Sequence, residues 1–189
     1  MLDRRRAVKR LLADRGDLLV VCGLGSPTYD VAAAGDDDRN FYLWGAMGGA
    51  AMIGLGLALA RPERRVLVLT GDGEMLMGMG ALATIAAKAP PNLAVVVLDN
   101  SRFGETGGQR SHTAGPTDLA AVAAGCGIPL TMSVTDEAGL DALAQSVRSA
   151  NATLFARISI APDMPPRVLP LRDGAALKRR FRAALGIGD

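Results

Sequence analysis

Two polar segments follow neighbouring apolar runs in a pattern that could build a metal site. Gly71-Asp72-Gly73 comes directly after the apolar run 65–70, and Asp99-Asn100 comes directly after the next one, 93–98. Because the carboxyl ends of parallel strands meet at the ligand-binding edge of an open α/β sheet, we expect Asp72 and Asn100 to lie close together. The glycines beside Asp72 let the backbone turn sharply and approach a ligand closely.

The helix expected to begin at Glu74 directs the amides of Gly73 and Glu74, with its dipole, at the space beside Asp72. Such amides favour an anion, whereas the carboxylate of Asp72 repels a bare phosphate. A divalent cation satisfies both, since Mg²⁺ binds carboxylate and phosphate oxygens together. Asn100 would supply a second oxygen, and a loop carbonyl just after it a third. Taken alone, Asp72 could be a helix N-cap and Asp99-Asn100 a turn, so the pair is the specific signal.

Strands and helices are expected to alternate along the chain. The expected strands cover 17–22, 41–44, 65–70, 93–98, 128–133 and 152–159, and the expected helices cover 3–14, 27–34, 46–60, 74–88, 117–125, 136–149 and 174–185. We expect Ser26 to cap the second helix, and the segment 101–116 to be a glycine-bearing loop. This alternation predicts an α/β fold, an open and mostly parallel sheet with helices on both faces.

The chain of 189 residues predicts one domain over 1–189, in which a proline-rich arm and a C-terminal helix form 162–189. The arm would pack on its own core or on another chain. A net charge of +2 with 4% aromatic residues argues against a nucleic-acid partner. The longest apolar run, 45–60, is too short for a membrane span. Cys22 and Cys126 lie outside any metal-ligand spacing, which favours a reduced, cytoplasmic protein.

The GDG motif, followed by an Asn at the end of the next strand, resembles the thiamine diphosphate (ThDP) signature. It is similar to the diphosphate-binding domain of the thiamine-dependent decarboxylase superfamily. Over roughly 17–160 the sequence resembles sulfopyruvate and phosphonopyruvate decarboxylases most, above all the small beta subunit of two-chain sulfopyruvate decarboxylases. The further segments that carry this similarity are Asn40-Phe41-Tyr42, Gly45-Ala46-Met47-Gly48, 54-GLGLALARP-62, Leu82-Ala83-Thr84 and 106-TGGQ-109.

The resemblance implies a set of metal ligands and a set of contacts to the cofactor. Mg²⁺ would be held by the side chains of Asp72 and Asn100 and by the main-chain carbonyl of Arg102. Met47 would wedge the cofactor into its bent shape. The cofactor-binding residues would be Gly25, Ser26, Gly45, Met47, Gly71, Asp72, Gly73, Glu74, Asn100, Arg102 and Phe103.

Two positions depart from the family pattern. Glu74 replaces the small polar residue that often follows GDG, so its side chain should point away from the diphosphate or meet a cation. Gly25 stands where relatives commonly have a hydroxyl residue, so one contact to the diphosphate is expected to be missing.

The family also uses a glutamate from a pyrimidine-binding domain, across a subunit interface, to activate the cofactor. The glutamates of this chain are residues 63, 74, 105 and 137, and none lies in a second α/β unit. We therefore expect a ThDP-dependent carboxy-lyase subunit that is inactive or weakly active alone. Its partner would be a subunit of similar size in a heterodimer or α₂β₂ assembly, and its substrate a small 2-oxo acid similar to sulfopyruvate or phosphonopyruvate.

Candidate catalytic residues lie in the loop 101–116. His112 is the only histidine and could supply a proton, although a surface role is the alternative. Gln109 could contact the substrate, and Arg102 or Arg110 could bind a sulfonate or phosphonate group.

Three other functions compete with this interpretation: a ThDP-dependent carboligase or acyl-transfer subunit, a non-catalytic ThDP-binding subunit, and a dinucleotide-binding enzyme. The last is disfavoured because the third glycine of G-x-G-x-x-G is absent from 23-GLGSPTYD-30.

Overall fold

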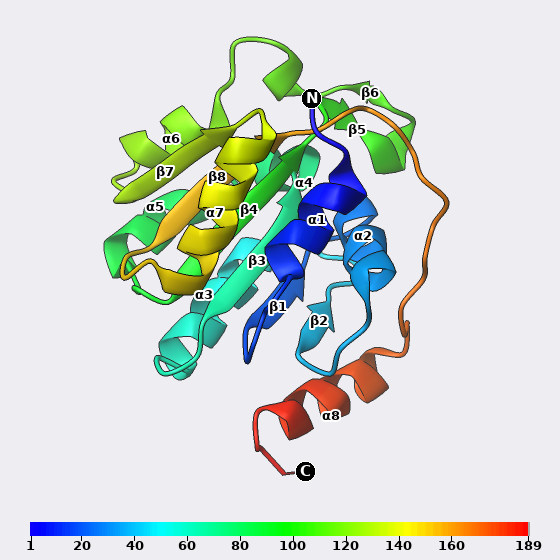
Figure 1. Cartoon of the computed structure of the whole chain (residues 1–189), viewed down its shortest axis with the longest axis vertical. Helices are drawn as coiled ribbons and strands as arrows, with labels where there is room; N and C mark the ends of the chain where they lie inside the picture. Colours follow the sequence, from blue (N-terminus) through cyan, green and yellow to red (C-terminus); the bar gives the residue numbers. More distant parts are fainter. Residues whose placement is uncertain (189) are drawn as a thin grey trace.

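A single sheet of six parallel strands organises the chain, in the order β2-β1-β3-β4-β8-β7 (Figure 1). A computed structural model describes residues 1–188. The strands are β1 (Leu19–Cys22), β2 (Asn40–Tyr42), β3 (Val66–Gly71), β4 (Leu93–Asp99), β7 (Leu130–Val134) and β8 (Leu154–Ser159). The chain leaves β1 for β2 on one side and returns to β3 on the other, so the strand order reverses between β1 and β3. Ligands bind open α/β sheets at such a reversal.

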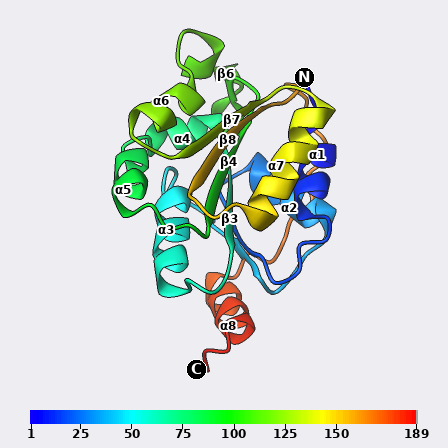
Figure 2. The same cartoon turned by 60° about the vertical axis from the view of Figure 1, so that its left-hand side comes forward.

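Helices cover both faces of the sheet, which confirms the predicted fold class (Figure 2). One face is covered by α1 (Arg4–Leu12), α2 (Ser26–Ala34) and α7 (Glu137–Ser149), and the other by α3 (Ala50–Ala60), α5 (Ala81–Lys88) and α6 (Leu119–Gly125). Successive strand residues point to opposite faces, so Val20 packs under α1 and Val21 under α3. Two separate apolar cores result.

The apolar segment 45–60 is only partly helical, since α3 begins at Ala50 rather than Ala46. Gly45, Ala46 and Gly48 have positive φ angles of 126°, 49° and 89°, which a helix does not allow. The strand expected at 41–44 is correspondingly shorter and ends at Tyr42. Within residues 1–188, no helix is long and apolar enough to cross a membrane.

The helix predicted over 74–88 is wrong in one respect, because it is two helices: α4 (Asp72–Met77) and α5. They are separated at Gly78, where an added Cβ would lie 2.3 Å from the carbonyl oxygen of Gly48. The loop before α3 therefore crosses the chain between α4 and α5 at close range, and only glycine leaves room for it.

Two further local predictions were wrong. Ser26 is the first residue of α2 and makes no capping hydrogen bond, because Gly25 occupies the N-cap position with φ 79°. The loop 101–116 contains a short antiparallel hairpin of β5 (Arg102–Phe103) and β6 (Gln109–Arg110), with 3₁₀ turns η1 (Gly104–Thr106) and η2 (His112–Ala114).

The proline-rich arm packs on its own chain and leads to α8 (Gly174–Ala184) at the far end of the sheet (Figure 1). Trp44 Nε1 donates a hydrogen bond of 3.0 Å to the carbonyl of Leu171. The ring of Phe181 in α8 meets the ring of Phe41 in β2 at a centroid distance of 5.5 Å. These contacts join the last helix to the edge strand β2.

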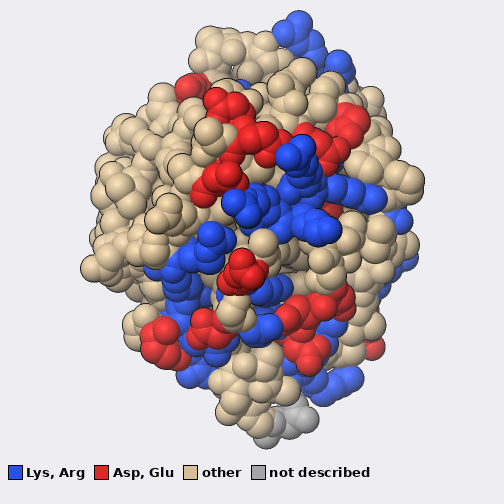
Figure 3. Space-filling model, in the orientation of Figure 1, with Lys and Arg blue, Asp and Glu red and all other residues tan. Residues whose placement is uncertain are grey.

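Charged side chains of both signs are interspersed on the face that carries α1 (Figure 3). Many form ion pairs there, for example Arg10 with Asp141 and Arg39 with Asp37. This face therefore presents no stripe of a single sign.

Candidate functional site

A pocket lies at the carboxyl edge of the sheet, at the point where the strand order reverses. It encloses about 630 Å³, including open solvent at its mouth. Among the residues expected at the cofactor, all except Gly25 and Gly45 line it: Ser26, Met47, Gly71, Asp72, Gly73, Glu74, Asn100, Arg102 and Phe103. The fold thus gathers into one cavity residues from four separate segments of the sequence.

Asp72 is the first residue of α4, and its side chain is only 2% exposed. Its Oδ2 accepts a hydrogen bond from the hydroxyl of Ser111, and the hydroxyl of Thr113 lies 3.3 Å from the same oxygen. Burial raises the pKa of Asp72 and the charge of Asp99 adds to this, while the hydrogen bond from Ser111 lowers it. Within residues 1–188 no Lys or Arg forms an ion pair with Asp72. A buried carboxylate without a cationic partner is costly, so a bound cation fits this position.

Asp99, at the end of the adjacent strand β4, differs from Asp72 in its charge balance. It is also buried, but the guanidinium of Arg157 on β8 forms an ion pair with it. Thr113 donates to its Oδ1 at 2.7 Å, and the amide of Ser101 does so at 2.8 Å. Of the two neighbouring carboxylates, Asp72 is therefore the one whose charge no Lys or Arg among residues 1–188 compensates.

Asn100 and Arg102 reach the pocket through a tight turn at Ser101, whose φ is 58°. The amide of Arg102 donates to Oδ1 of Asn100 at 3.0 Å, and the guanidinium of Arg102 spans the hairpin to the carbonyl of Gly108 at 3.0 Å. Within the described part of the chain, no three His, Cys, Asp or Glu side chains cluster so that they could hold a metal ion by themselves. One carboxylate with neutral oxygens is a donor set that suits Mg²⁺ rather than Zn²⁺.

The loop 101–116 closes over Gly73 in the pocket and over Gly25 beside it. A Cβ added at Gly73 would lie 2.7 Å from the ring of Phe103, and one added at Gly25 would lie 2.6 Å from Oε1 of Glu105. Side chains at these glycines would push the loop away. The absence of side chains therefore lets Phe103 and Glu105 lie directly on the backbone that surrounds Asp72.

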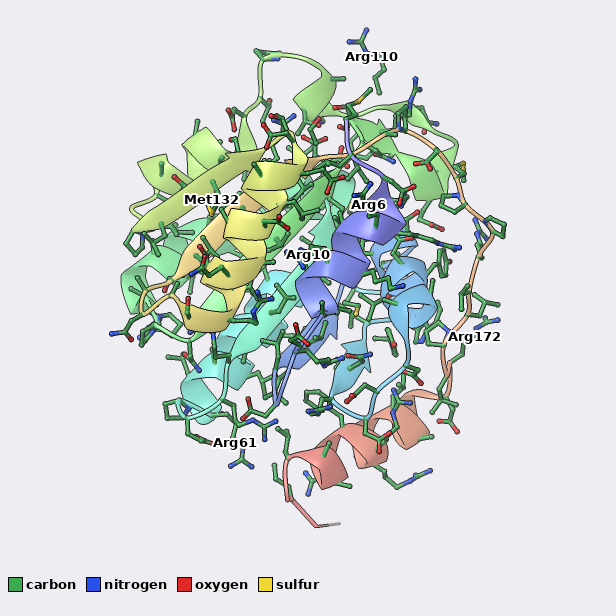
Figure 4. All side chains as sticks on the ribbon, viewed as in Figure 1. Arg6, Arg10, Arg61, Arg110, Met132 and Arg172 are labelled. Atoms are coloured by element: carbon green, nitrogen blue, oxygen red, sulfur yellow. The ribbon has the colours of Figure 1, made fainter. Side chains whose placement is uncertain are left out.

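Of the candidates in this loop, Arg102 lines the pocket, whereas His112, Gln109 and Arg110 do not. His112 is exposed, and its ring packs edge-on against Phe103 at a centroid distance of 5.9 Å. Gln109 donates back to the carbonyl of Thr106 at 2.8 Å, within the hairpin. Arg110 donates to the carbonyl of Ala114 and extends from the outer end of the loop (Figure 4). The arrangement seen here brings none of the three to Asp72.

Sequence reasoning missed Ser111 and Thr113, which bind Asp72 and Asp99. Their hydroxyls are also 2.9 Å apart, so they form one continuous polar cluster above the two strand ends. Ser and Thr are common in loops, and nothing in the spacing distinguishes these two. Only the return of the hairpin to the sheet edge reveals them.

Comparison with known proteins identifies the family. Residues 30–157 match the family model described as "Thiamine pyrophosphate enzyme, C-terminal TPP binding domain". The chain is 41% identical over 162 residues to the sulfopyruvate decarboxylase subunit beta of Methanothermobacter thermautotrophicus, and this match covers 86% of this chain and 84% of that protein. It is 35% identical to the subunit beta of Methanocaldococcus jannaschii, covering 91% of this chain and 95% of that one.

A longer relative and a solved structure complete the comparison. The chain is 42% identical to the phosphonopyruvate decarboxylase of Streptomyces viridochromogenes over 95% of its own length, but it spans only 45% of that protein. It shares its fold, with a TM-score of 0.70 and 18% identity, with a 2-oxoglutarate:ferredoxin oxidoreductase from Magnetococcus marinus, covering 94% of this chain and 74% of that one. The family match and the identity to the beta subunits show that this chain belongs to the family of C-terminal TPP-binding domains of thiamine pyrophosphate enzymes.

Proposed function

We propose that this chain is the diphosphate- and Mg²⁺-binding subunit of a two-chain, ThDP-dependent 2-oxo acid decarboxylase that acts on a substrate similar to sulfopyruvate or phosphonopyruvate. The observation that carries the proposal is the buried, unpaired carboxylate of Asp72 in a pocket at the sheet edge. The names of the relatives, which are decarboxylases, support the choice of reaction.

In this proposal the metal is held by the carboxylate of Asp72, the side-chain oxygen of Asn100 and the carbonyl of Arg102. Each of the three residues lines the pocket. The metal would offset the charge of both Asp72 and the diphosphate, so that the two anions can lie side by side. When bound, ThDP supplies a centre that accepts the electron pair left behind as CO₂ departs.

The remaining contacts divide between the two ends of the cofactor. The amides of Gly73 and Glu74 at the start of α4, with Gly25 and Ser26, would bind the diphosphate. Met47 would support the bend, and the carbonyl of Gly45 would accept a hydrogen bond from the aminopyrimidine. The other pocket residues in this set are Gly71 and Phe103, and Phe103 would exclude water from the diphosphate end. We assign no role to His112 or Gln109 in the arrangement described above.

The activating glutamate would come from a partner subunit that carries a pyrimidine-binding domain. The only pocket-lining glutamates within residues 1–188 are Glu74 and Glu105. Glu74 is occupied by contacts inside the chain, and Glu105 lies on the turn at Gly25. Neither is therefore available to the pyrimidine ring. The two relatives named subunit beta support a two-chain assembly.

Apolar side chains beside the pocket support the presence of such a partner. Met77 lines the pocket and is 62% exposed, and Met52, Leu59 and Met79 are also exposed on α3 and on the connection between α4 and α5. No ionisable residue occurs in α3. Exposed apolar side chains of this kind commonly mark protein interfaces. We infer that the partner covers them, and that the assembly acts in the cytoplasm, where the free thiols of Cys22 and Cys126 stay reduced.

The test is to assay the chain alone and together with the protein that co-purifies with it from its source cells. Release of CO₂ from sulfopyruvate or phosphonopyruvate should require Mg²⁺, ThDP and both chains. Decarboxylation by the purified chain alone at ordinary enzyme rates would contradict the need for a partner. Formation of a carbon–carbon bond with an added aldehyde, without net release of free aldehyde product, would favour the carboligase alternative.

A further inference from the structure

The carboxyl group of Glu74 is buried among segments that surround the pocket. The side chain is 6% exposed. Oε2 accepts a hydrogen bond from the hydroxyl of Thr70 at 2.8 Å, and Oε1 lies 3.4 Å from the amide of Ala50. Burial raises the pKa of Glu74, while Thr70 and the nearby amides of Ala50, Leu24 and Gly48 lower it. Three of these neighbours are backbone amides, which can only donate, and the fourth is a hydroxyl. No Lys or Arg within residues 1–188 pairs with the group.

This placement resolves the departure at Glu74 noted in the sequence. The side chain meets no cation and turns from α4 toward the loop 45–49 and the turn after β1. The turn is shaped to receive it, since a Cβ added at Gly23 would lie 1.8 Å from Oε2. The absence of a side chain at Gly23 therefore leaves the space that the carboxyl group of Glu74 fills.

Glu74 also supplies the start of α3 with an acceptor that the helix itself lacks. The N-cap residue of α3 is Gly49, no side chain of its own caps the helix, and its first turn carries no acidic residue. Unpaired amides and the positive end of the helix dipole favour a carboxylate there. Glu74 provides one from a different element and so joins α4 to the beginning of α3.

Of the two segments that Glu74 contacts, the loop 45–49 depends on it more. The turn after β1 is held independently, because Gly23 donates to Leu69 at 2.8 Å and its carbonyl accepts from Thr28 at 2.8 Å. The loop 45–49 contains three positive φ angles and one internal backbone hydrogen bond, from Gly49 to Ala46. A backbone in this unusual conformation persists only when its surroundings fix it.

We propose that Glu74 is a positioning residue whose carboxyl group fixes the loop 45–49, and with it Gly45 and Met47, against the cofactor pocket. This inference rests on the proposed function for the identity of the ligand, but not for the effect on the loop. Glu74 acts through the loop, and only its backbone amide would touch the cofactor.

The test compares Glu74→Gln with Glu63→Gln, a matched change at an exposed glutamate. Glutamine replaces one acceptor oxygen with an NH₂ donor, which the surrounding backbone amides cannot accept, and it removes the negative charge. In hydrogen–deuterium exchange without cofactor, we expect peptides that cover 45–52 to exchange faster in Glu74→Gln alone, with β4 unchanged. Equal exchange in all three proteins, or faster exchange throughout the chain, would overturn the inference.

A second measurement separates the two ends of the cofactor. With Mg²⁺ present, Glu74→Gln should lower the affinity for ThDP by about tenfold, as expected for one lost buried hydrogen bond, and the affinity for inorganic diphosphate by much less. Equal losses for both ligands would contradict a role through the loop 45–49. If the wild-type chain binds neither ligand even with its partner present, the proposed function fails, while the exchange result still decides the role of Glu74.

A second variant keeps the inference testable if Glu74→Gln does not fold. Gly23→Ala does not change residue 74. It puts a methyl group where Oε2 of Glu74 lies, so the carboxyl group must move. We expect the same faster exchange over 45–52. Protection equal to that of the wild type would count against the inference.

Discussion

Thr113 Oγ1 lies 2.7 Å from Oδ1 of Asp99, and this hydrogen bond joins the loop above the pocket to the end of β4. The same hydroxyl is 3.3 Å from Oδ2 of Asp72. A threonine hydroxyl has one proton to donate, and the shorter distance assigns it to Asp99. The hydroxyl of Ser111 then donates its proton to Oδ2 of Asp72. The two loop hydroxyls therefore orient two neighbouring carboxylates that have different tasks.

Ser111→Ala should weaken Mg²⁺ binding about 10- to 100-fold, the usual effect of removing a partner that orients a metal ligand. Without this hydroxyl, Oδ2 of Asp72 loses the donor that orients it. The measurement is a Mg²⁺ titration of ThDP binding by calorimetry. The control is Thr113→Val, which removes the hydroxyl that donates to Asp99 and should weaken Mg²⁺ binding less. An equal loss in both variants would contradict the assignment of Ser111 to Asp72.

Asp72→Ala should abolish Mg²⁺-dependent ThDP binding and leave the fold intact. The folded state loses a buried, unpaired charge, so the change has no reason to unfold the chain. Calorimetric titration measures binding, and circular dichroism checks the fold. The matched control is Asp141→Ala, which removes an exposed aspartate that pairs with Arg10 on the surface. Unchanged ThDP binding in Asp72→Ala would remove Asp72 from the set of ligands.

Gly73→Ala should weaken ThDP binding and destabilise the fold by about 1–3 kcal/mol, because the new methyl group meets the ring of Phe103. Gly80→Ala is the control, since no atom lies within 4 Å of its added Cβ and its φ of −60° suits alanine. That change should stabilise the chain by about 0.4–1 kcal/mol. Thermal unfolding of both variants measures the change in stability. An equal change in both would show that the contact with Phe103 is unimportant.

Acid should release α8 before the rest of the fold. Burial alone would raise the pKa of Asp36, but hydrogen bonds from Arg180 in α8 and from Tyr42 hold it below its ordinary value. A lowered pKa in the folded state means that the stabilisation is present above the unfolded pKa of about 3.9 and is lost as the pH falls further, through the folded pKa. We therefore expect α8 to loosen below about pH 4.

The fluorescence of Trp44, the single tryptophan, can follow this change because its indole contacts the carbonyl of Leu171 just before α8. Asp36→Asn should remove the acid transition from the Trp44 signal. Asp141→Asn should keep it. A transition at the same pH in wild type and Asp36→Asn would assign the acid sensitivity to other groups.

The sequence predicted the sheet and the position of the pocket because both depend on local patterns. Apolar runs mark the strands, and the glycines around Asp72 mark a turn at a strand end. The relation between Glu74 and Gly23 could not be predicted in this way. It depends on which segments the topology places side by side, and glutamate at the start of a helix is ordinarily exposed.

The other differences from the sequence expectations have a similar physical origin. The break between α4 and α5 follows from the crossing of the loop at Gly48, which is distant from Gly78 in sequence. His112 and Gln109 were expected near the chemistry because their loop follows Asn100. The hairpin of β5 and β6 turns their side chains outward and brings Ser111 and Thr113 to the carboxylates instead.

The docking of α8 on β2 has a consequence for biosynthesis. Arg180 donates to the carbonyl of Asn40, and these two residues are 140 positions apart in the chain. At ribosomal rates of about 5–20 residues per second, the edge of β2 waits on the order of 10 s before its covering helix is made. An uncovered strand edge can pair with other chains. A nascent chain of this protein is therefore open to aggregation at β2, and to chaperone binding there, until the last helix leaves the ribosome.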